Sequence, residues 1–190
     1  MPDTYTFVLN VVSSDHPGII AGVSTALYEM DANIDSCSQT VLDGYFTLIL
    51  IVTLPQLWDA DELAGHIQSH SLLGDSYKIT AMAAVSEGAV PHSGQSDIDI
   101  FVITAFGKDD KGIVHDFCRY LADREINILD FYGRRQNEEF LLVAHVQIPA
   151  RHTIAVLQDD LEAIALERHF TVRLQHNNIF VATNEIRLFD

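Results

Sequence analysis

The chain has 190 residues, 48% of them hydrophobic, enough to bury a core in one large domain or two small ones. Its net charge is −16, and residues 1–90 carry a single base, Lys78. Nucleic acids and anionic membranes are bound through Lys and Arg, so this charge argues against direct nucleic-acid binding and against a membrane partner. With neither a signal segment nor an apolar run long enough to span a bilayer, we expect a cytoplasmic protein.

The first half alternates strand and helix patterns. Apolar and aromatic residues at 5–12 predict a strand, and an apolar stripe at helical spacing predicts a helix from Pro17 to Met30. Residues 34–42 and 45–54 predict a hairpin, because Asp43-Gly44 between them favours a two-residue turn. Asp59 and Glu62 predict a capping box for a second helix, and residues 78–85 predict the closing strand.

The second half repeats this order after a segment rich in small residues, Pro and Gly. We predict strands at 98–106, 127–134, 139–148 and 171–175, with helices at 113–121 and 154–164. The predicted domains are a first module at 1–86, a linker at 87–97, a second module at 98–176 and a tail at 177–190. The tail contains a candidate short helix, which either covers its own core or docks on a second copy. The predicted fold class is α+β, with two ferredoxin-like βαββαβ modules in tandem, antiparallel sheets and helices on one face.

The two halves can be superposed by a shift of 94 residues, which aligns residues 5–55 with 99–149 without a gap. Most of the identical pairs are apolar and are explained by a shared core. Three polar or small pairs are not explained in this way: Asp15/Asp109, Gly18/Gly112 and Asn33/Asn127. We expect each trio to lie together where the first strand, the first helix and the second strand meet, and to have a function there.

The chemistry of this corner suits a small anion. Pro17 fits the first position of a helix, and Gly18 lets the backbone approach a ligand closely. The free N–H groups and partial positive charge of a helix start favour a carboxylate. A purely structural explanation stays open, in which Asp15 caps the helix and Asn33 closes a turn.

Two segments resemble the motifs of proteins with two ACT domains, and of the glycine cleavage system transcriptional repressor family in particular. They are Asp15-His16-Pro17-Gly18-Ile19 with Asn33-Ile34, and Asp109-Asp110-Lys111-Gly112-Ile113-Val114 with Asn127-Ile128. The resemblance implies an amino acid effector held where two modules meet, between the turn before the first helix and the start of the second strand. The implied ligand-binding residues are Asp15, His16, Pro17, Gly18, Ile19 and Asn33, with Asp109, Lys111, Gly112, Ile113 and Asn127 in the second half.

A zwitterion such as glycine or serine fits these groups. The amides of Gly18 and Ile19 can hold its carboxylate, and Asp15 with the side-chain carbonyl of Asn33 can accept from its ammonium. Lys111 stands where the family usually has Pro, so the second site departs from the pattern. His66 and His70 have the spacing of a metal pair, but no third ligand lies near them in sequence, and we predict no metal site.

Our first hypothesis is a non-enzymatic sensor, in which a small amino acid effector shifts the contacts of a homo-oligomer with a regulatory protein partner such as a transcription factor. The alternative is an interaction module with vestigial ligand sites. An enzyme is the least favoured class, because the two modules and the tail use up the chain and no catalytic residues or cofactor site can be assigned. We also expect Cys37 and Cys118 to be buried thiols.

Overall fold

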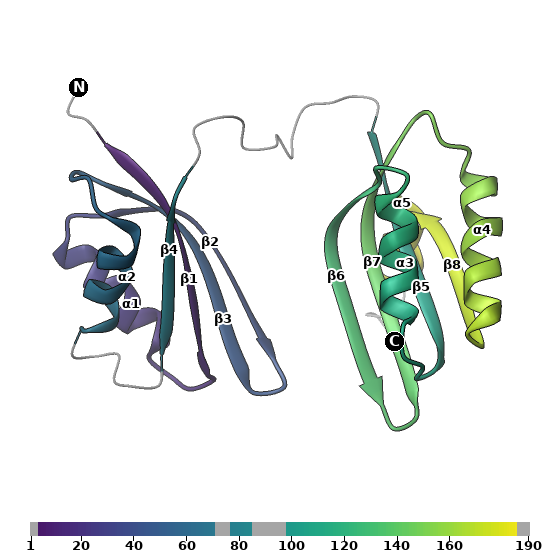
Figure 1. The fold of residues 1–190 in the computed structure, drawn as a ribbon, viewed down its shortest axis with the longest axis horizontal. Helices are drawn as coiled ribbons and strands as arrows, with labels where there is room; N and C mark the ends of the chain where they lie inside the picture. The colour runs from purple at the N-terminus through teal and green to yellow at the C-terminus, as the bar shows by residue number, and fades with distance from the viewer. Residues whose placement is uncertain (1–3, 71–76, 85–97, 186–190) are drawn as a thin grey trace. The chain divides into compact units, whose positions relative to one another are not determined.

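The computed structural model describes residues 4–70, 77–84 and 98–185. The chain divides into two compact units, Met1–Val90 and Pro91–Asp190, each with its own sheet and helices (Figure 1). The predicted linker at 87–97 lies outside the described residues, and the predicted domain boundaries stay a prediction.

The first module has the predicted βαββαβ order. Its elements are β1 (Tyr5–Ser14), α1 (Ile19–Glu29), β2 (Asn33–Leu42), β3 (Tyr45–Leu54), α2 (Ala60–Gln68) and β4 (Lys78–Ala83). Helix α1 begins two residues later than expected, because Gly18 and not a residue before Pro17 is its N-cap.

The second module repeats the order and adds a helix. Its elements are β5 (Ile98–Lys108), α3 (Ile113–Ala122), β6 (Asn127–Gln136), β7 (Glu139–Pro149), α4 (Ile154–Glu167), β8 (Phe170–His176) and α5 (Asn177–Glu185). The predicted fold class is therefore confirmed, and the tail does contain a helix.

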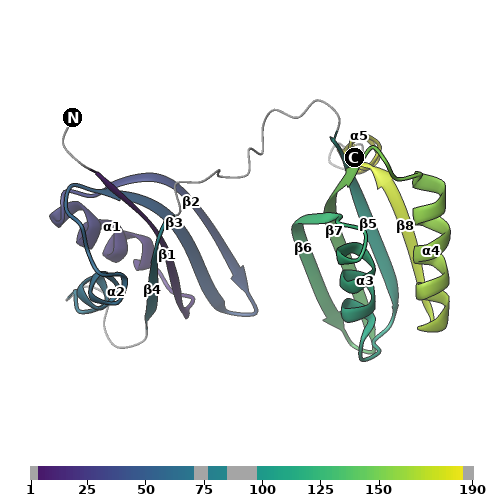
Figure 2. The same cartoon turned by 45° about the horizontal axis from the view of Figure 1, so that its top comes forward.

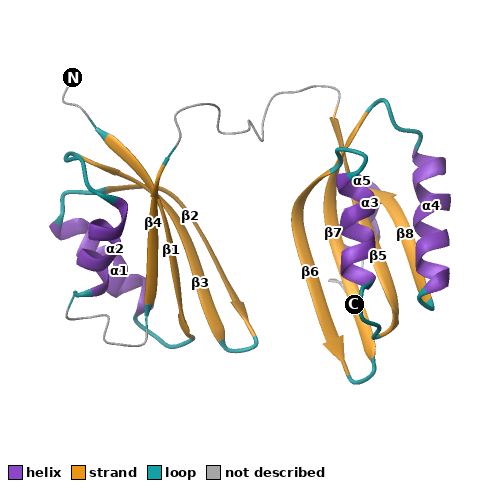
Figure 3. Ribbon diagram, viewed as in Figure 1, coloured by secondary structure: helices purple, strands orange, loops and turns teal. Residues whose placement is uncertain are grey.

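Each sheet has four antiparallel strands, in the order β2-β3-β1-β4 in the first module and β6-β7-β5-β8 in the second. Figure 3 shows each sheet with the two helices of its βαββαβ unit on one side. The register repeats as well, including a shift between Ile34 and Ser36 in β2 that recurs between Ile128 and Asp130 in β6. The duplication seen in the sequence thus extends to the irregularities of the backbone.

Local signals explain the turns and one helix start. Asp43 and Gly44 have φ angles of 49° and 83°, the positive pair that matches a hairpin turn to the twist of its strands. The Asp59 side chain accepts hydrogen bonds from the backbone N–H groups of Asp61 and Glu62 at 2.9 and 3.2 Å, so the predicted cap of α2 is confirmed.

The core of each module lies between the sheet and its two helices. Alternate residues of the central strands point into it, because successive side chains of a strand face opposite sides. The core of the first module includes Leu9, Leu50, Leu27 and Leu63, and the second is built around Ile103, Ala144, Phe117 and Leu161. No helix within the described ranges is long and apolar enough to cross a membrane.

The edge strand β2 lies outside the first core. All ten of its residues are exposed, including Cys37, and Cys118 is only partly buried. The expectation that both thiols are buried is therefore wrong. An edge strand has a neighbour on one side only, and here its side chains have little cover on either face.

Helix α5 lies on the face of the second sheet that α3 and α4 leave open. Val102 of β5 is directly opposite His145 of β7, so both side chains point to this open face. The ring of Phe180 in α5 meets the His145 ring edge-on, with centroids 6.2 Å apart, and Val102 is only 1% exposed. Figure 2 shows α5 beside the end of β8. In this structure the tail helix covers its own module.

Candidate functional site

The loop between β1 and α1 is held by its backbone. The N–H of Asp15 donates to the carbonyl of Gly44 in the hairpin turn at 2.8 Å, and Gly18 is the N-cap of α1 with a left-handed φ of 99°. Glycine suits this position because a Cβ strains a left-handed backbone. The loop therefore turns sharply into the helix without a side-chain cap.

The start of α1 is open. No side chain caps the helix, and a Cβ placed on Gly18 would meet nothing within 4 Å. The first N–H groups of a helix have no partner within it, so these amides remain free for an outside acceptor. Asp15 is not the cap, which removes that part of the structural explanation of the motif.

Asp15 and His16 differ in their surroundings. No residue in the described part of the chain pairs with the Asp15 carboxylate. The Nδ1–H of His16 donates to the carbonyl of Pro17 at 3.0 Å, which leaves Nε2 of the neutral ring to accept from the hydroxyl of Tyr77, also at 3.0 Å. Since Tyr77 is 4% exposed and precedes β4, His16 anchors the loop to the core.

Asn33 lies at the first residue of β2 and makes a local contact. Its amide nitrogen donates to a carboxylate oxygen of Asp35 at 2.6 Å, and Thr53 of β3 donates to the other oxygen at 2.6 Å. The Asn33 side-chain carbonyl is left as a free acceptor. Asp35 was missed by sequence reasoning, because the irregular register that gives it these partners is a property of strand pairing.

Within one module, Asp15 and Asn33 do not lie together. Asn33 pairs with Thr53, whereas Ser14 pairs with Tyr45, eight residues earlier on the same strand. Eight residues of strand span about 27 Å at roughly 3.4 Å each. The expectation that Asp, Gly and Asn meet at one corner is therefore wrong for a single module. Helix α1 carries the chain back along the sheet, so its start and the start of β2 lie at opposite ends.

The loop of the second module repeats this backbone. The N–H of Asp109 donates to the carbonyl of Glu138 at 2.7 Å, and Gly112 is the N-cap of α3 with a φ of 103°. Ile113 is the first residue of the helix, and Asn127 begins β6 at the far end of the sheet, opposite Gln147. The two loops have the same shape and differ in side chains.

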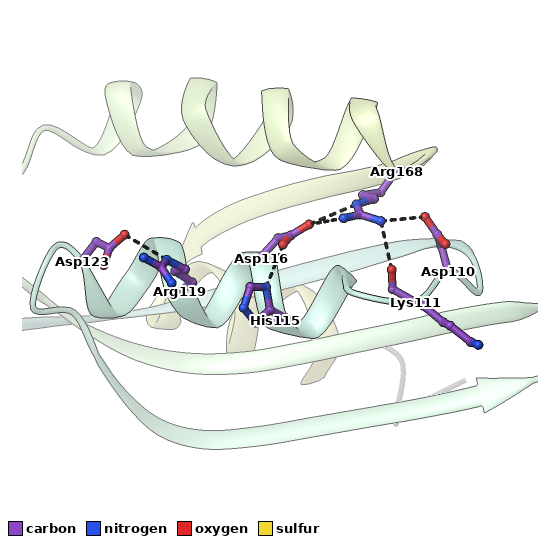
Figure 4. A network of polar contacts seen from close by, with 7 residues as sticks. All are labelled: Asp110, Lys111, His115, Asp116, Arg119, Asp123 and Arg168. Atoms are coloured by element: carbon purple, nitrogen blue, oxygen red, sulfur yellow. Dashed lines mark hydrogen bonds and ion pairs between the residues drawn. The ribbon is translucent and has the colours of Figure 1, made fainter.

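Arg168, at the end of α4, fills the second loop (Figure 4). Its guanidinium donates to the Lys111 carbonyl at 2.9 Å, to Asp110 at 3.2 Å and to Asp116 at 3.0 Å. A Cβ on Gly112 would lie only 3.2 Å from the Arg168 Nη2. The Lys111 side chain extends away from this network, so Lys111 contributes its carbonyl rather than its ammonium.

The acids of the second loop are neutralised within the protein. Arg135 pairs with Asp109 at 3.5 Å, and Arg168 pairs with Asp116 at 2.8 Å. A hydrogen bond from His115, with a further contribution from Arg168, lowers the pKa of the Asp116 carboxyl below its ordinary value. His115 Nδ1 lies 2.9 Å from a carboxylate oxygen of Asp116, its neighbour on α3. Cys118 takes no part in this network.

His66 lies in α2 and His70 lies two residues beyond its end, and the two rings make separate contacts. His70 Nε2 lies 3.2 Å from a carboxylate oxygen of Glu29. The ring of His66 packs on the ring of Trp58, with the two centroids 5.2 Å apart. Among the described residues, no three side chains of the metal-ligating types are grouped so as to hold an ion.

Comparison with known sequences matches residues 5–70 and 99–175 to the ACT domain family. A UPF0237 protein of Listeria monocytogenes is 36% identical over 86 residues, which is 38% of this chain and 97% of that protein. A UPF0237 protein of Corynebacterium efficiens is 56% identical over 45 residues, 24% of this chain, so the chain spans about half the length of that relative.

Two solved structures resemble nearly the whole chain. A protein of unknown function from Galdieria sulphuraria has a TM-score of 0.67 at 22% identity, and a candidate glycine cleavage system transcriptional repressor has 0.58 at 17%. Each comparison covers 92% of this chain and 99% of the other. At these identities the likeness concerns the fold. The family match covers both halves of the sequence, and this chain therefore belongs to the ACT domain family, with one ACT domain in each module.

Proposed function

We propose that this chain is a cytoplasmic, non-enzymatic regulatory protein that binds a small amino acid, glycine or serine, at the loop before α1. Binding changes its contacts with a regulatory protein partner. Transcriptional control of glycine cleavage is the process we favour, because a candidate repressor of that system shares the fold over 92% of the chain.

One observation carries the proposal: the open, uncapped start of α1 lies three residues after the unpaired carboxylate of Asp15. Free amides attract a carboxylate, and an unpaired acid attracts an ammonium. Glycine and serine carry both groups within a few ångströms of each other. The first module has no arginine that could take the carboxylate instead.

In this proposal Asn33 enters the site only from the first module of a second copy of the chain. Two such modules packed antiparallel along β2 and α1, across a two-fold axis, bring the start of one β2 beside the start of the other α1. The exposure of every residue of β2 supports an interface there. In this arrangement the free carbonyl of Asn33 accepts from the ammonium, and the protein acts as an oligomer.

We assign the effector to the first module. At the second loop, a carboxylate must compete for a helix start where Arg168 already binds Asp110, Asp116 and the Lys111 carbonyl. Asp109, Lys111, Gly112, Ile113 and Asn127 therefore form the weaker of the two proposed sites.

A thermal-shift titration of the full chain tests the proposal. A ligand at one hundred times its dissociation constant stabilises the folded state by about 2.7 kcal/mol, a shift of several degrees for a module of this size. Glycine or serine should give this shift. Acetate lacks the ammonium and glycinamide lacks the carboxylate, so neither should match it.

Asp15→Asn is the decisive variant, with Asp109→Asn as its matched control in the other module. Loss of a charge-assisted hydrogen bond costs about 1.5–3 kcal/mol, so Asp15→Asn should weaken binding at least ten-fold and Asp109→Asn should not. An unchanged response of Asp15→Asn would place the ligand elsewhere. If no amino acid shifts the wild-type transition at millimolar concentration, the protein is better explained as an assembly module with vestigial sites.

A further inference from the structure

Helix α5 and the open face of the second sheet enclose a groove, here named the α5 groove, with a volume of about 470 Å³. This is within the size range of small-molecule sites. Its lining includes Thr104 and Phe106 of β5, Arg173 and Gln175 of β8, and Phe180 and Thr183 of α5. Thr104 and Arg173 are direct cross-strand partners, so their side chains leave the sheet side by side.

Arg173 differs from most of the described arginines because it has no acidic partner among the described residues. Among the described arginines, those at 119, 124, 135, 151 and 168 each pair with an acid. Arg134 and Arg173 form no ion pair with any residue in the described part of the chain. An unpaired arginine is unexpected in a protein with 27 acids and 11 Lys and Arg residues.

The two unpaired arginines lie on the same face, on either side of Phe106. Arg134 is opposite Leu141, which is opposite Phe106, so the three share the open face. Arg134 also lines a cavity of about 100 Å³ that borders Phe106. The open face thus has an aromatic centre with a free guanidinium to each side.

The remaining polar groups of the α5 groove favour an anion. The described residues that line the groove include one cationic side chain and no carboxylate. The side chains of Thr104 and Gln175 make no hydrogen bond with other described residues, so both can donate to a ligand next to Arg173. Among these described residues an ammonium would find no acid, in contrast to the loop before α1.

The apolar walls favour a ring. Phe106 is 44% exposed although it stands on a central strand, and Phe180 lines the groove from α5. A flat apolar group can lie against these rings and bury them, while Arg173 holds a carboxylate at the β8 side.

We propose that the α5 groove binds a small aromatic carboxylate without an ammonium group. This site is separate from the amino acid site of the first module and does not rest on it. Since α5 forms one wall, a bound ligand also fixes the tail helix on its sheet.

Titration of the full chain, followed by NMR and calorimetry, tests this with three matched probes. 3-Phenylpropanoate should bind and shift the amide signals of β8 and α5. L-Phenylalanine, which adds an ammonium to the same skeleton, should bind this groove at least ten-fold more weakly, and so should propanoate, which lacks the ring. If L-phenylalanine or propanoate binds the groove as tightly as 3-phenylpropanoate, the proposed ligand class is wrong. If 3-phenylpropanoate does not bind at millimolar concentration, the proposed site is wrong.

Arg173→Gln should weaken 3-phenylpropanoate binding at least ten-fold, because it removes the charge while keeping a polar side chain. Arg119→Gln is the control, since Arg119 lies on α3 and pairs with Asp123. Thr104→Val, which keeps the shape of the side chain, should lower the affinity for 3-phenylpropanoate several-fold. This variant gives a second measurement if Arg173→Gln folds poorly. Wild-type affinity in both groove variants refutes the proposal. Asp15→Asn should leave this binding unchanged, which separates it from the amino acid site.

Discussion

Replacing Gly18 by alanine tests the backbone on which the proposed amino acid site depends. Gly18 has a φ of 99°, and a left-handed conformation costs a residue with a Cβ about 1–2 kcal/mol. Alanine also restricts the unfolded chain, which returns about 0.4–1 kcal/mol. The net loss should be near 1 kcal/mol, which lowers the midpoint of thermal unfolding by roughly 4–8 °C in a module of this size.

The fluorescence of Trp58 is the assay. It is the only tryptophan of the chain and packs against the core of the first module. Gly65→Ala is the control: Gly65 lies inside α2, where its φ is not left-handed and an added Cβ would meet nothing within 4 Å. This control should be neutral or stabilising, by up to about 1 kcal/mol, because alanine favours helix.

The matching substitution in the second module should cost more. Gly112 has a φ of 103°, and its added Cβ would also press on Arg168 at 3.2 Å. Unfolding of this module can be followed by far-UV circular dichroism. The reasoning fails if Gly18→Ala is as stable as wild type, or if Gly112→Ala is the milder of the two. Gly18→Ala should also reduce the glycine response, because its methyl group occupies the open space at the start of α1.

Two further predictions concern ionisable groups of the second module. Arg168→Gln should lower thermal stability at pH 7. It should also reduce the loss of stability in acid. Asp116, with its lowered pKa, stabilises the fold above the ordinary carboxyl pKa of about 3.9 and ceases to do so as the pH falls through its folded pKa. Melting curves from pH 2.5 to 7 measure both effects, and equal acid sensitivity in the variant would contradict the assignment. The Tyr120 hydroxyl donates to Asp160 at 2.9 Å, and burial raises the pKa of Tyr120 to about 12. The stabilising effect of Tyr120 should therefore be complete below pH 10 and lost between about pH 10 and 12. Tyr120→Phe should cost about 1 kcal/mol at pH 7 and remove this alkaline dependence, as urea unfolding at pH 7 and 11 can show.

Local chemistry made the fold predictable. The positive φ angles of Asp43 and Gly44 follow from a two-residue turn, and the Asp59 cap follows from the residues after it. The 94-residue repeat then showed that the second half must fold like the first. Each of these features depends on residues close in sequence or on a period within one element.

The proposed site residues remain a prediction, and their placement in the module was only partly predictable from the sequence. The order strand, helix, strand already implied that the start of α1 and the start of β2 lie at opposite ends of the sheet, and this consequence separates Asp15 from Asn33. Asp35 could not be singled out, because its partners depend on the irregular pairing of β2 with β3.

The sequence by itself determined two duplicated βαββαβ modules, because hydrophobic periodicity, turn residues and a helix cap act over short distances. Only the tertiary structure decided which loop is open. Arg168 lies 56 positions beyond Gly112 and reaches it because α4 ends beside the start of α3, whereas Asp15 has no such cation among the described residues. Contacts of this kind depend on how elements pack, and the spacing of residues along the chain does not reveal them.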